Sequence, residues 1–79
     1  MQIQVVVFAT LRKYLPDLPI GGVRWFEVEP DATIADLLPL LELPAEEVKI
    51  IVRNNLHAEW DERLVDGDRV AFIPAVGGG

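Results

Sequence analysis

The residues with the clearest chemical potential are three consecutive glycines at the end of the sequence, Gly77, Gly78 and Gly79. Glycine has no Cβ and the widest backbone freedom, so such a segment can thread a narrow tunnel that side chains would block. We expect Gly79 to present a free α-carboxylate at the tip of a slim arm. Fully extended, the segment from Ala75 to Gly79 would span roughly 16 Å. The ordinary alternative is a frayed terminus, which most domains have.

No other group in the sequence forms a recognisable catalytic centre. The chain has no cysteine, which excludes disulfides, thiolate metal sites and a cysteine nucleophile. The single histidine, His57, has no evident partner and is interpreted as an ordinary surface residue. Glu42, Glu46 and Glu47 are typical of a solvated helix face rather than a metal site. We therefore expect no metal, no bound cofactor and no catalytic side chain.

Length and composition indicate one small globular domain. The chain has 79 residues, of which 51% are hydrophobic, enough for a core without covalent cross-links. The formal net charge of -6 argues against nucleic acid as a partner, because phosphates would repel the domain. It suits a basic partner surface, and it is also an ordinary route to solubility. With no apolar run of membrane-spanning length and no signal peptide, we expect a cytoplasmic protein that binds no membrane.

Apolar and β-branched runs predict five strands in this chain. They are expected over residues 2–9, 23–29, 49–54, 56–60 and 69–73. Asn54-Asn55 and Asp66-Gly67-Asp68 are predicted turns between strands, and residues 11–15 a short helical turn or loop.

One helix is predicted between the second and third strands. Thr33 followed by Asp36 approximates a capping box, in which each residue satisfies a backbone donor of the other. An apolar stripe at helical spacing follows, formed by Ile34, Leu37, Leu38 and Leu41. Pro39 lacks the N–H that would continue the helical hydrogen bonds, so we expect a kink or an early stop there.

The order strand, strand, helix, strand, short strand, strand predicts one helix packed on one face of a mixed sheet. This is an α+β fold of the β-grasp arrangement, the architecture of ubiquitin. Residues 1–74 are expected to form the domain and 75–79 its C-terminal tail. The predicted core consists of Ile3, Val5, Val7, Phe26, Val28, Leu37, Leu38, Leu41, Ile50, Val52, Val70 and Phe72.

Strict alternation leaves several apolar residues on the opposite, polar side of their strands. Phe8 and Ile73 should adjoin, because the first and last strands of a β-grasp sheet are neighbours. Ile51 is expected nearby, facing outward. An exposed apolar patch on a small protein usually marks an interface, so we predict a docking face beside the arm. The alternative is that each is a singly exposed apolar residue, which is normal.

Three stretches of the sequence resemble the ubiquitin-like sulfur carriers of the MoaD and ThiS type, and MoaD more closely. Residues 8–12 are similar to the pattern F-A-x-L-R, and residues 33–38 to T-x-x-D-L-L. Residues 66–79 are similar to the family ending D-G-D-x-V-A-x-x-P-P-V-x-G-G. Ala75 replaces the second proline of that ending, and Gly77 stands where another residue commonly precedes the diglycine.

The resemblance implies that Gly79 is the reacting residue and that Gly77 and Gly78 thread the tail. A MoeB- or ThiF-type adenylyltransferase would use ATP to activate the carboxylate, and a sulfur nucleophile would convert it to a thiocarboxylate. A MoaE-like large subunit would then receive the tail and pass the sulfur to the pterin of a molybdenum or tungsten cofactor. Leu56 matches the position of a family contact residue. The predicted partner-binding set is therefore Phe8, Ile51, Leu56, Ile73, Pro74 and Val76.

Three alternatives stay open beside this interpretation. Within the same class, the chain is a ThiS-like carrier for the thiazole of thiamine. From a different class, it is a protein modifier that forms isopeptide bonds to lysines. The third alternative is a binding module whose tail is inert.

Overall fold

The computed structural model describes residues 1–18 and 22–75. Its five strands are β1 (Gln2–Val7), β2 (Arg24–Glu27), β3 (Ile50–Arg53), β4 (Leu56–Ala58) and β5 (Arg69–Ile73). The helical elements are the 3₁₀ turns η1 (Ala9–Tyr14), η2 (Ile34–Asp36) and η3 (Ala45–Glu47), and the short helix α1 (Leu37–Leu41). Every strand predicted from the sequence is present, although several are shorter than predicted.

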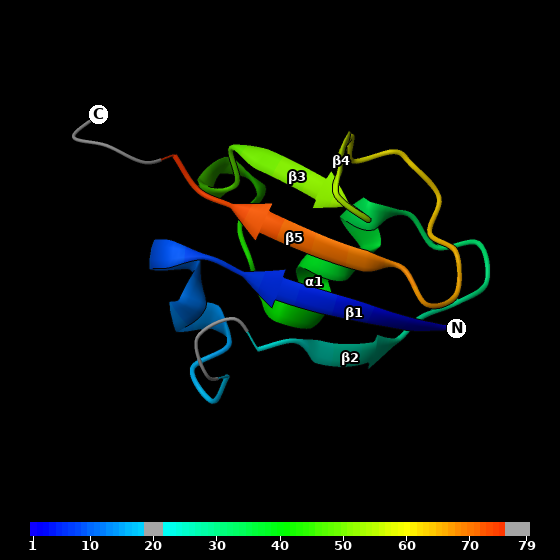
Figure 1. Ribbon diagram of the computed structural model, residues 1–79, viewed down its shortest axis with the longest axis horizontal. Coiled ribbons are helices and arrows are strands. Elements are labelled where there is room, and N and C mark those ends of the chain that lie inside the picture. The colour runs from blue at the N-terminus through cyan, green and yellow to red at the C-terminus, as the bar shows by residue number, and fades with distance from the viewer. Residues whose placement is uncertain (19–21, 76–79) are drawn as a thin grey trace.

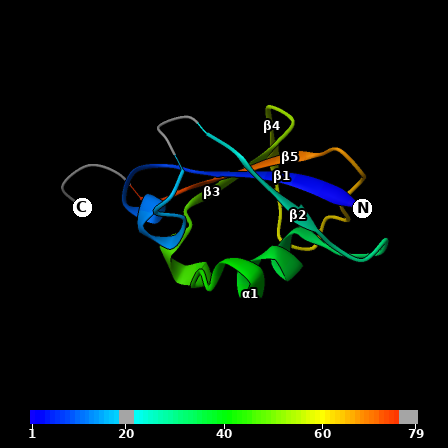
Figure 2. The same ribbon diagram turned by 90° about the horizontal axis from the view of Figure 1, so that it is seen from below.

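The strands form one mixed sheet in the order β2-β1-β5-β3-β4 (Figure 1). β1 pairs antiparallel with β2 and parallel with β5, while β3 pairs antiparallel with both β5 and β4. The helical segment of η2 and α1 crosses one face of the sheet, and no helix of the described residues covers the other face (Figure 2). This is the predicted β-grasp fold. In the described part of the chain, no helix is long and apolar enough to cross a membrane.

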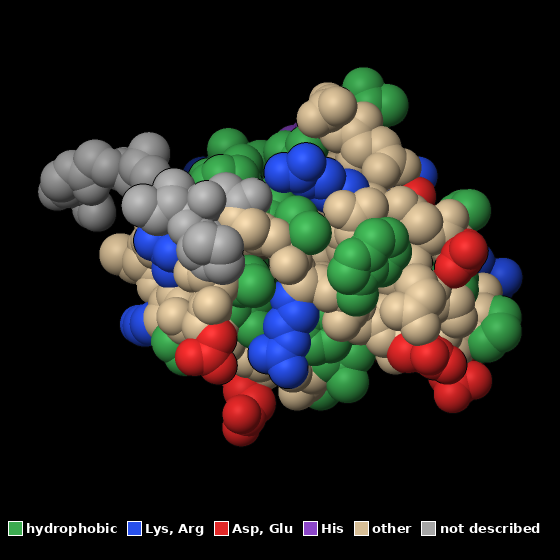
Figure 3. Space-filling view, turned by 60° about the horizontal axis from the view of Figure 1, so that its bottom comes forward, with side chains coloured by type: hydrophobic (Ala, Val, Ile, Leu, Met, Phe, Trp, Pro, Cys, Tyr) green, Lys and Arg blue, Asp and Glu red, His purple; other side chains and the backbone are tan. Residues whose placement is uncertain are grey.

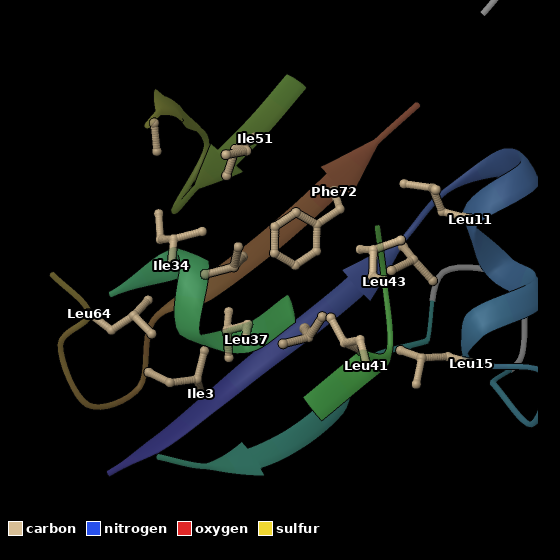
Figure 4. Packing of buried hydrophobic residues seen from close by; sticks show 14 of the residues in the cluster. Ile3, Leu11, Leu15, Ile34, Leu37, Leu41, Leu43, Ile51, Leu64 and Phe72 are labelled. Atoms are coloured by element: carbon tan, nitrogen blue, oxygen red, sulfur yellow. The ribbon is translucent and has the colours of Figure 1, made fainter. Parts of the chain in front are cut away.

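The core lies between the sheet and the helical layer. Val5 pairs with Val70 and Val7 with Phe72 across the two central strands, and these side chains meet α1 (Figure 4). The buried cluster comprises Ile3, Val5, Val7, Leu11, Leu15, Ala32, Ile34, Leu37, Leu41, Leu43, Ile51, Ala58, Leu64, Val70 and Phe72. Phe26, Val28 and Leu38, which were predicted as core, are partly buried against it. Trp60 adds a ring stacked on Phe72, with centroids 5.8 Å apart.

The prediction for β3 was inverted. Ile51 is only 5% exposed and belongs to the core, whereas Ile50 is 39% exposed and Val52 lies on the same side as Ile50. The cause is a run of three apolar residues, which contains no alternation to set the phase. The phase is set by pairing with β5: Ile51 lies opposite buried Phe72, and Ile50 lies opposite Ile73. Pairing partners in a sheet point to the same face.

The helical segment begins and ends as its sequence predicts. The backbone N–H of Thr33 donates to Asp36 Oδ2 at 2.8 Å, which is one half of the predicted capping box. Pro39 occupies the middle of α1, and the helix stops two residues later. Glu42 then adopts a left-handed conformation with φ of 53°, and the N–H of Leu43 closes the end by donating to the Leu38 carbonyl at 3.1 Å.

Two turns lock the register of the sheet at the end away from the tail. Asn54 and Asn55 have φ values of 52° and 70°, as a two-residue hairpin turn requires. Gly67 has φ of 87°, and its N–H donates to the Gln2 carbonyl at 2.8 Å. The Gln2 N–H in turn donates to Asp66 Oδ1 at 2.7 Å, so this turn ties the start of β1 to the start of β5.

The inverted phase of β3 gives a matched test on two adjacent isoleucines. Ile51→Ala is expected to lower the free energy of unfolding by about 2–5 kcal/mol, because it opens a cavity in the core. Ile50→Ala is expected to lower it by about 1 kcal/mol or less, because Ile50 is 39% exposed and lies outside the core. Urea unfolding with an unchanged m-value measures both changes. A larger loss for Ile50→Ala would contradict the observed register.

Candidate functional site

The tail begins at the end of a central strand that is held on both sides. The Phe8 N–H donates to the Phe72 carbonyl at 3.2 Å, from the β1 side. The Lys49 N–H donates to the Ile73 carbonyl at 2.8 Å, from the β3 side. Pro74 is buried and Ala75 is exposed, so the buried part of the described chain ends at Pro74. The predicted residues Val76, Gly77, Gly78 and Gly79 lie outside the described part of the chain.

The sheet face opposite α1 surrounds this exit, and we call it the open face. By register and alternation its central part includes Val6 and Phe8 of β1, Arg69, Ala71 and Ile73 of β5, and Ile50 and Val52 of β3. Phe8 is 41% exposed and Ile73 is half-buried. A shallow hollow of about 220 Å³ lies between them, lined by Phe8, Val52, Asn55, Arg69, Ala71 and Ile73. The predicted proximity of Phe8 and Ile73 is confirmed, and their role in partner binding stays a prediction.

Three residues of the predicted partner-binding set lie elsewhere than expected. Ile51 is in the core and offers no surface to a partner. Pro74 is buried at the end of β5. Leu56 is 72% exposed, but it sits on the edge strand β4, two residues from Ala58, which faces the core. Alternation therefore places Leu56 on the side of the sheet that carries α1, away from the open face.

Sequence reasoning misplaced two members of the open face, because Ile50 and Val52 were assigned to the core. The available signal was the phase of β5, whose alternation is unambiguous. Transferring that phase across an antiparallel pairing with β3 would have placed Ile50 and Val52 correctly.

Charge is distributed unevenly between the two layers. Residues 29–47 contain six acidic and no basic side chains, so the charge of this segment alone equals the net charge of the chain, -6. It runs through α1 on the far side of the sheet (Figure 2). On the surface drawn in Figure 3, basic side chains reach the centre of the view, whereas acidic ones lie mostly at its lower and right-hand margins. The sheet layer is therefore close to neutral.

A polar contact fixes the two 3₁₀ turns at the tail end of the domain. The Tyr14 hydroxyl of η1 donates a hydrogen bond to the Glu47 carboxylate of η3, and Lys13 Nζ lies 3.4 Å from Glu47 Oε1. The hydrogen bond from Tyr14, helped by the Lys13 charge, lowers the pKa of Glu47 against an opposing desolvation. The same hydrogen bond, followed by burial and the charges of Glu47 and Glu46, raises the pKa of Tyr14.

A larger hollow, of about 390 Å³, lies on the other side of the domain. It is lined by Glu27, Val28, Glu29, Asp31, Ala32, Asp36 and Leu40, between the end of β2 and the helical segment. Its carboxylates do not form a metal site: among the described residues, no group of His, Cys, Asp or Glu is arranged to hold a metal ion. The described domain thus offers a tail base and an apolar face, and we find no catalytic constellation in it.

Comparison with solved structures supports the fold over the whole length. SAMP1 from Haloferax volcanii, a small archaeal modifier protein, superposes with a TM-score of 0.75 at 24% identity, covering 100% of both chains. A putative molybdopterin converting factor subunit 1 from Pyrococcus furiosus gives 0.74 at 23% identity, covering 96% of this chain and 99% of that one. A chain from the complex of molybdopterin-converting factor subunits 1 and 2 of Helicobacter pylori gives 0.65 at 20% identity, covering 100% of both.

The fold and the tail base define a small ubiquitin-like protein of the β-grasp type. The family model of the ThiS family matches residues 5–79, so the chain belongs to the ThiS family of sulfur carriers. No curated protein matches the chain.

The contact between Tyr14 and Glu47 predicts a measurable titration. Because the folded pKa of Glu47 lies below the ordinary value of 4.5, its contribution to stability is present above that value and is lost as the pH falls through the folded pKa. Tyr14→Phe keeps the ring but removes the donor, so it is expected to raise the pKa of Glu47. Lys13→Gln should raise it less. NMR titration of the Glu47 side-chain carbon measures both, and an unchanged pKa in Tyr14→Phe would contradict the contact.

Proposed function

We propose that this chain carries sulfur as a thiocarboxylate on Gly79 and donates it in the synthesis of molybdopterin. The observation that supports this proposal most is the family match, which continues to residue 79 and so includes the terminal glycines. Similarity of fold alone would not support a role for the terminal glycine. The domain is the sulfur-donating small subunit of a two-subunit synthase, and the catalytic side chains belong to its partners.

The chemistry needs an activated carboxylate. The charge of a carboxylate repels nucleophiles, and its oxygen is a poor leaving group. An oxygen of Gly79 attacks the α-phosphorus of ATP and displaces pyrophosphate, which leaves an acyl adenylate. A sulfur nucleophile then attacks the acyl carbon and displaces AMP, so that one carboxylate oxygen is exchanged for sulfur. A MoeB- or ThiF-type enzyme performs the activation, and ATP binds to that enzyme.

The structure of the tail base suits presentation of the terminus to another active site. Ile73 is hydrogen-bonded on the β3 side, and β1 holds the adjacent Phe72. The starting point of the tail is therefore fixed within a rigid sheet. From Ala75, the remaining residues reach roughly 16 Å if extended. A rigid base and a slender end place the carboxyl carbon deep in a partner while the domain stays outside.

The open face is the proposed docking surface for these partners. Phe8, Ile50 and Ile73 surround the tail exit and are partly exposed, and a patch of this kind favours association. In the Helicobacter pylori complex, subunit 1 of the converting factor is bound to subunit 2. We propose the same arrangement here, with a MoaE-like large subunit that takes the tail after sulfur has been loaded.

Two alternatives remain, and each has a supporting observation. The likeness to SAMP1, a modifier protein, favours attachment of Gly79 to lysines of other proteins. The family model itself is that of ThiS, which favours a carrier that supplies the thiazole of thiamine. A sulfur-loaded chain that reacts with a thiazole synthase and not with a MoaE-like subunit would replace the molybdopterin assignment.

Changing the terminus is expected to abolish sulfur loading without altering the fold. An alanine added after Gly79 displaces the carboxylate and introduces a side chain beside it. Deleting Gly79 draws the carboxylate back by about 3.3 Å, far outside the tolerance of a catalytic geometry. Incubation with a MoeB-type enzyme, ATP and a sulfur source should change the intact mass of the unaltered chain by one oxygen-to-sulfur exchange. Mass spectrometry of the terminal peptide locates the exchange.

The outcomes of this experiment separate the candidate functions. A modifier would appear covalently attached to lysines of other proteins, and an inert tail would show no change in mass. The matched control is an alanine inserted before Met1, which adds the same residue at the N-terminus and leaves the C-terminal glycines unchanged. Full loading of the extended chain would remove the sulfur-carrier proposal.

Charged substitutions on the open face are expected to weaken partner binding while the domain stays folded. Phe8→Lys or Ile73→Lys places a cation in an apolar contact, and a central contact is typically worth about 2 kcal/mol, or roughly thirtyfold in affinity. Val65→Lys is the control, because Val65 is 63% exposed and lies outside this face. Calorimetric titration with a MoaE-like subunit measures the affinity, and thermal unfolding verifies the fold. Normal binding by both variants would show that Phe8 and Ile73 are singly exposed apolar residues and not part of a docking surface.

A further inference from the structure

Arg69 is the one charged side chain among the residues that line the hollow on the open face. It begins β5, where its N–H donates to Asn54 Oδ1 at 2.9 Å and its carbonyl accepts from the Asn54 N–H at 2.9 Å. Its backbone is therefore fixed by the β3–β4 turn. Alternation along β5 places its side chain on the same face as Ala71 and Ile73.

Within residues 1–18 and 22–75, no carboxylate forms an ion pair with Arg69. The acid next to it in sequence is occupied: Asp68 accepts hydrogen bonds from Asn54 Nδ2 and the Val65 N–H, each at 2.8 Å, on the buried side of the sheet. The acid that alternation places on the open face of β2, Glu27, accepts from Gln2 Nε2 at 2.8 Å, two strands away from β5. Arg69 thus presents an uncompensated guanidinium beside an apolar hollow.

The size of the hollow indicates what kind of occupant it suits. At about 220 Å³ it is smaller than the roughly 300–1,000 Å³ of small-molecule pockets, and it is open. Phe8, Val52 and Ile73 supply apolar walls, which suit an apolar side chain of another protein. The guanidinium at its margin suits a carboxylate, which it can bind through two parallel hydrogen bonds.

We propose that the adenylylating partner docks on the open face with an apolar side chain in this hollow and a carboxylate that pairs with Arg69. The proposal rests on the proposed function and specifies its docking partner by local chemistry. The net charge of -6 suggests a basic partner, but that charge belongs to the helical layer. The open face calls for an acidic group.

The test is the kinetics of adenylation by the MoeB- or ThiF-type enzyme of the same genome, followed by ATP–pyrophosphate exchange at varied carrier concentration. Arg69→Gln is expected to raise KM about tenfold, which corresponds to loss of one close interfacial charge pair. Arg69→Glu should raise KM further, by repulsion. The kcat should stay unchanged, because Arg69 lies at the opposite end of β5 from the tail and contributes to binding alone.

The control is Arg63→Glu, which makes the same change in charge at an exposed residue outside the open face. Its KM should equal that of the unaltered chain. Raising the salt concentration should raise KM for the unaltered chain and have little effect on Arg69→Gln. Unchanged KM in Arg69→Glu, or an equal rise in Arg63→Glu, would overturn the proposed contact while leaving the sulfur-carrier function standing. Absence of any exchange with the unaltered chain would instead overturn the proposed function, and the docking contact with it.

Discussion

The parallel pairing of β1 with β5 is the constraint on which the rest of the structure depends. It joins residues 4–7 to residues 69–72, so almost the whole chain lies within the loop that this pairing closes. Parallel neighbours cannot be joined by a tight turn, and here the crossover contains the helical layer and two further strands. The entropic cost of closing this loop is offset by burial in the core, because the paired residues of β1 and β5 pack against α1. The first and last strands thereby become the centre of the sheet.

This pairing also determines what surrounds the end of β5. β5 is a central strand, so its end has a neighbour on each side. The Ile73 carbonyl accepts a hydrogen bond from the β3 side, and the Phe72 carbonyl accepts one from the β1 side. An edge strand would leave one side of the tail base unpaired. Parallel alignment further brings the end of β1 beside the end of β5, which places Phe8 next to Ile73. The proximity of this apolar surface to the end of β5 is therefore a consequence of one topological choice.

The motif Asp66-Gly67-Asp68 belongs to the part of the sequence that resembles the family ending, yet its contacts are structural. Asp66 binds the N–H of Gln2, Gly67 takes the left-handed conformation between them, and Asp68 binds Asn54 and the backbone of Val65. These bonds fix the register of β5 against β1 and β3. A slip of one residue would turn Arg69 and Ile73 toward the core and Val70 and Phe72 toward solvent. This motif thus determines which side chains of β5 face the core and which form the open face.

The sequence predicts most of the fold because β1, β5 and the helical segment have clear periodicities. Val5, Val70 and Leu37 were placed in the core from alternation or helical spacing alone, and the stop after Pro39 followed from its missing N–H. Ile51 was misplaced because its neighbours are also apolar, so only long-range pairing decides its side. Leu11 and Leu15 were not predicted as core because a 3₁₀ turn has no stripe of its own and is buried by packing on the sheet. The tail residues beyond Ala75 were predicted by chemistry, and the described structure ends before them.

The separation of charge between layers explains why net charge is a poor guide to the partner of this domain. The segment from residue 29 to 47 accounts for the whole net charge and runs through α1, on the side of the sheet opposite the open face. Exposed charges interact weakly beyond the Debye length of about 8 Å at physiological salt, so groups in direct contact weigh more at a docking surface than the net charge of -6. In the proposed docking, Arg69 and the apolar residues around it, rather than the acidic helical layer, select the partner.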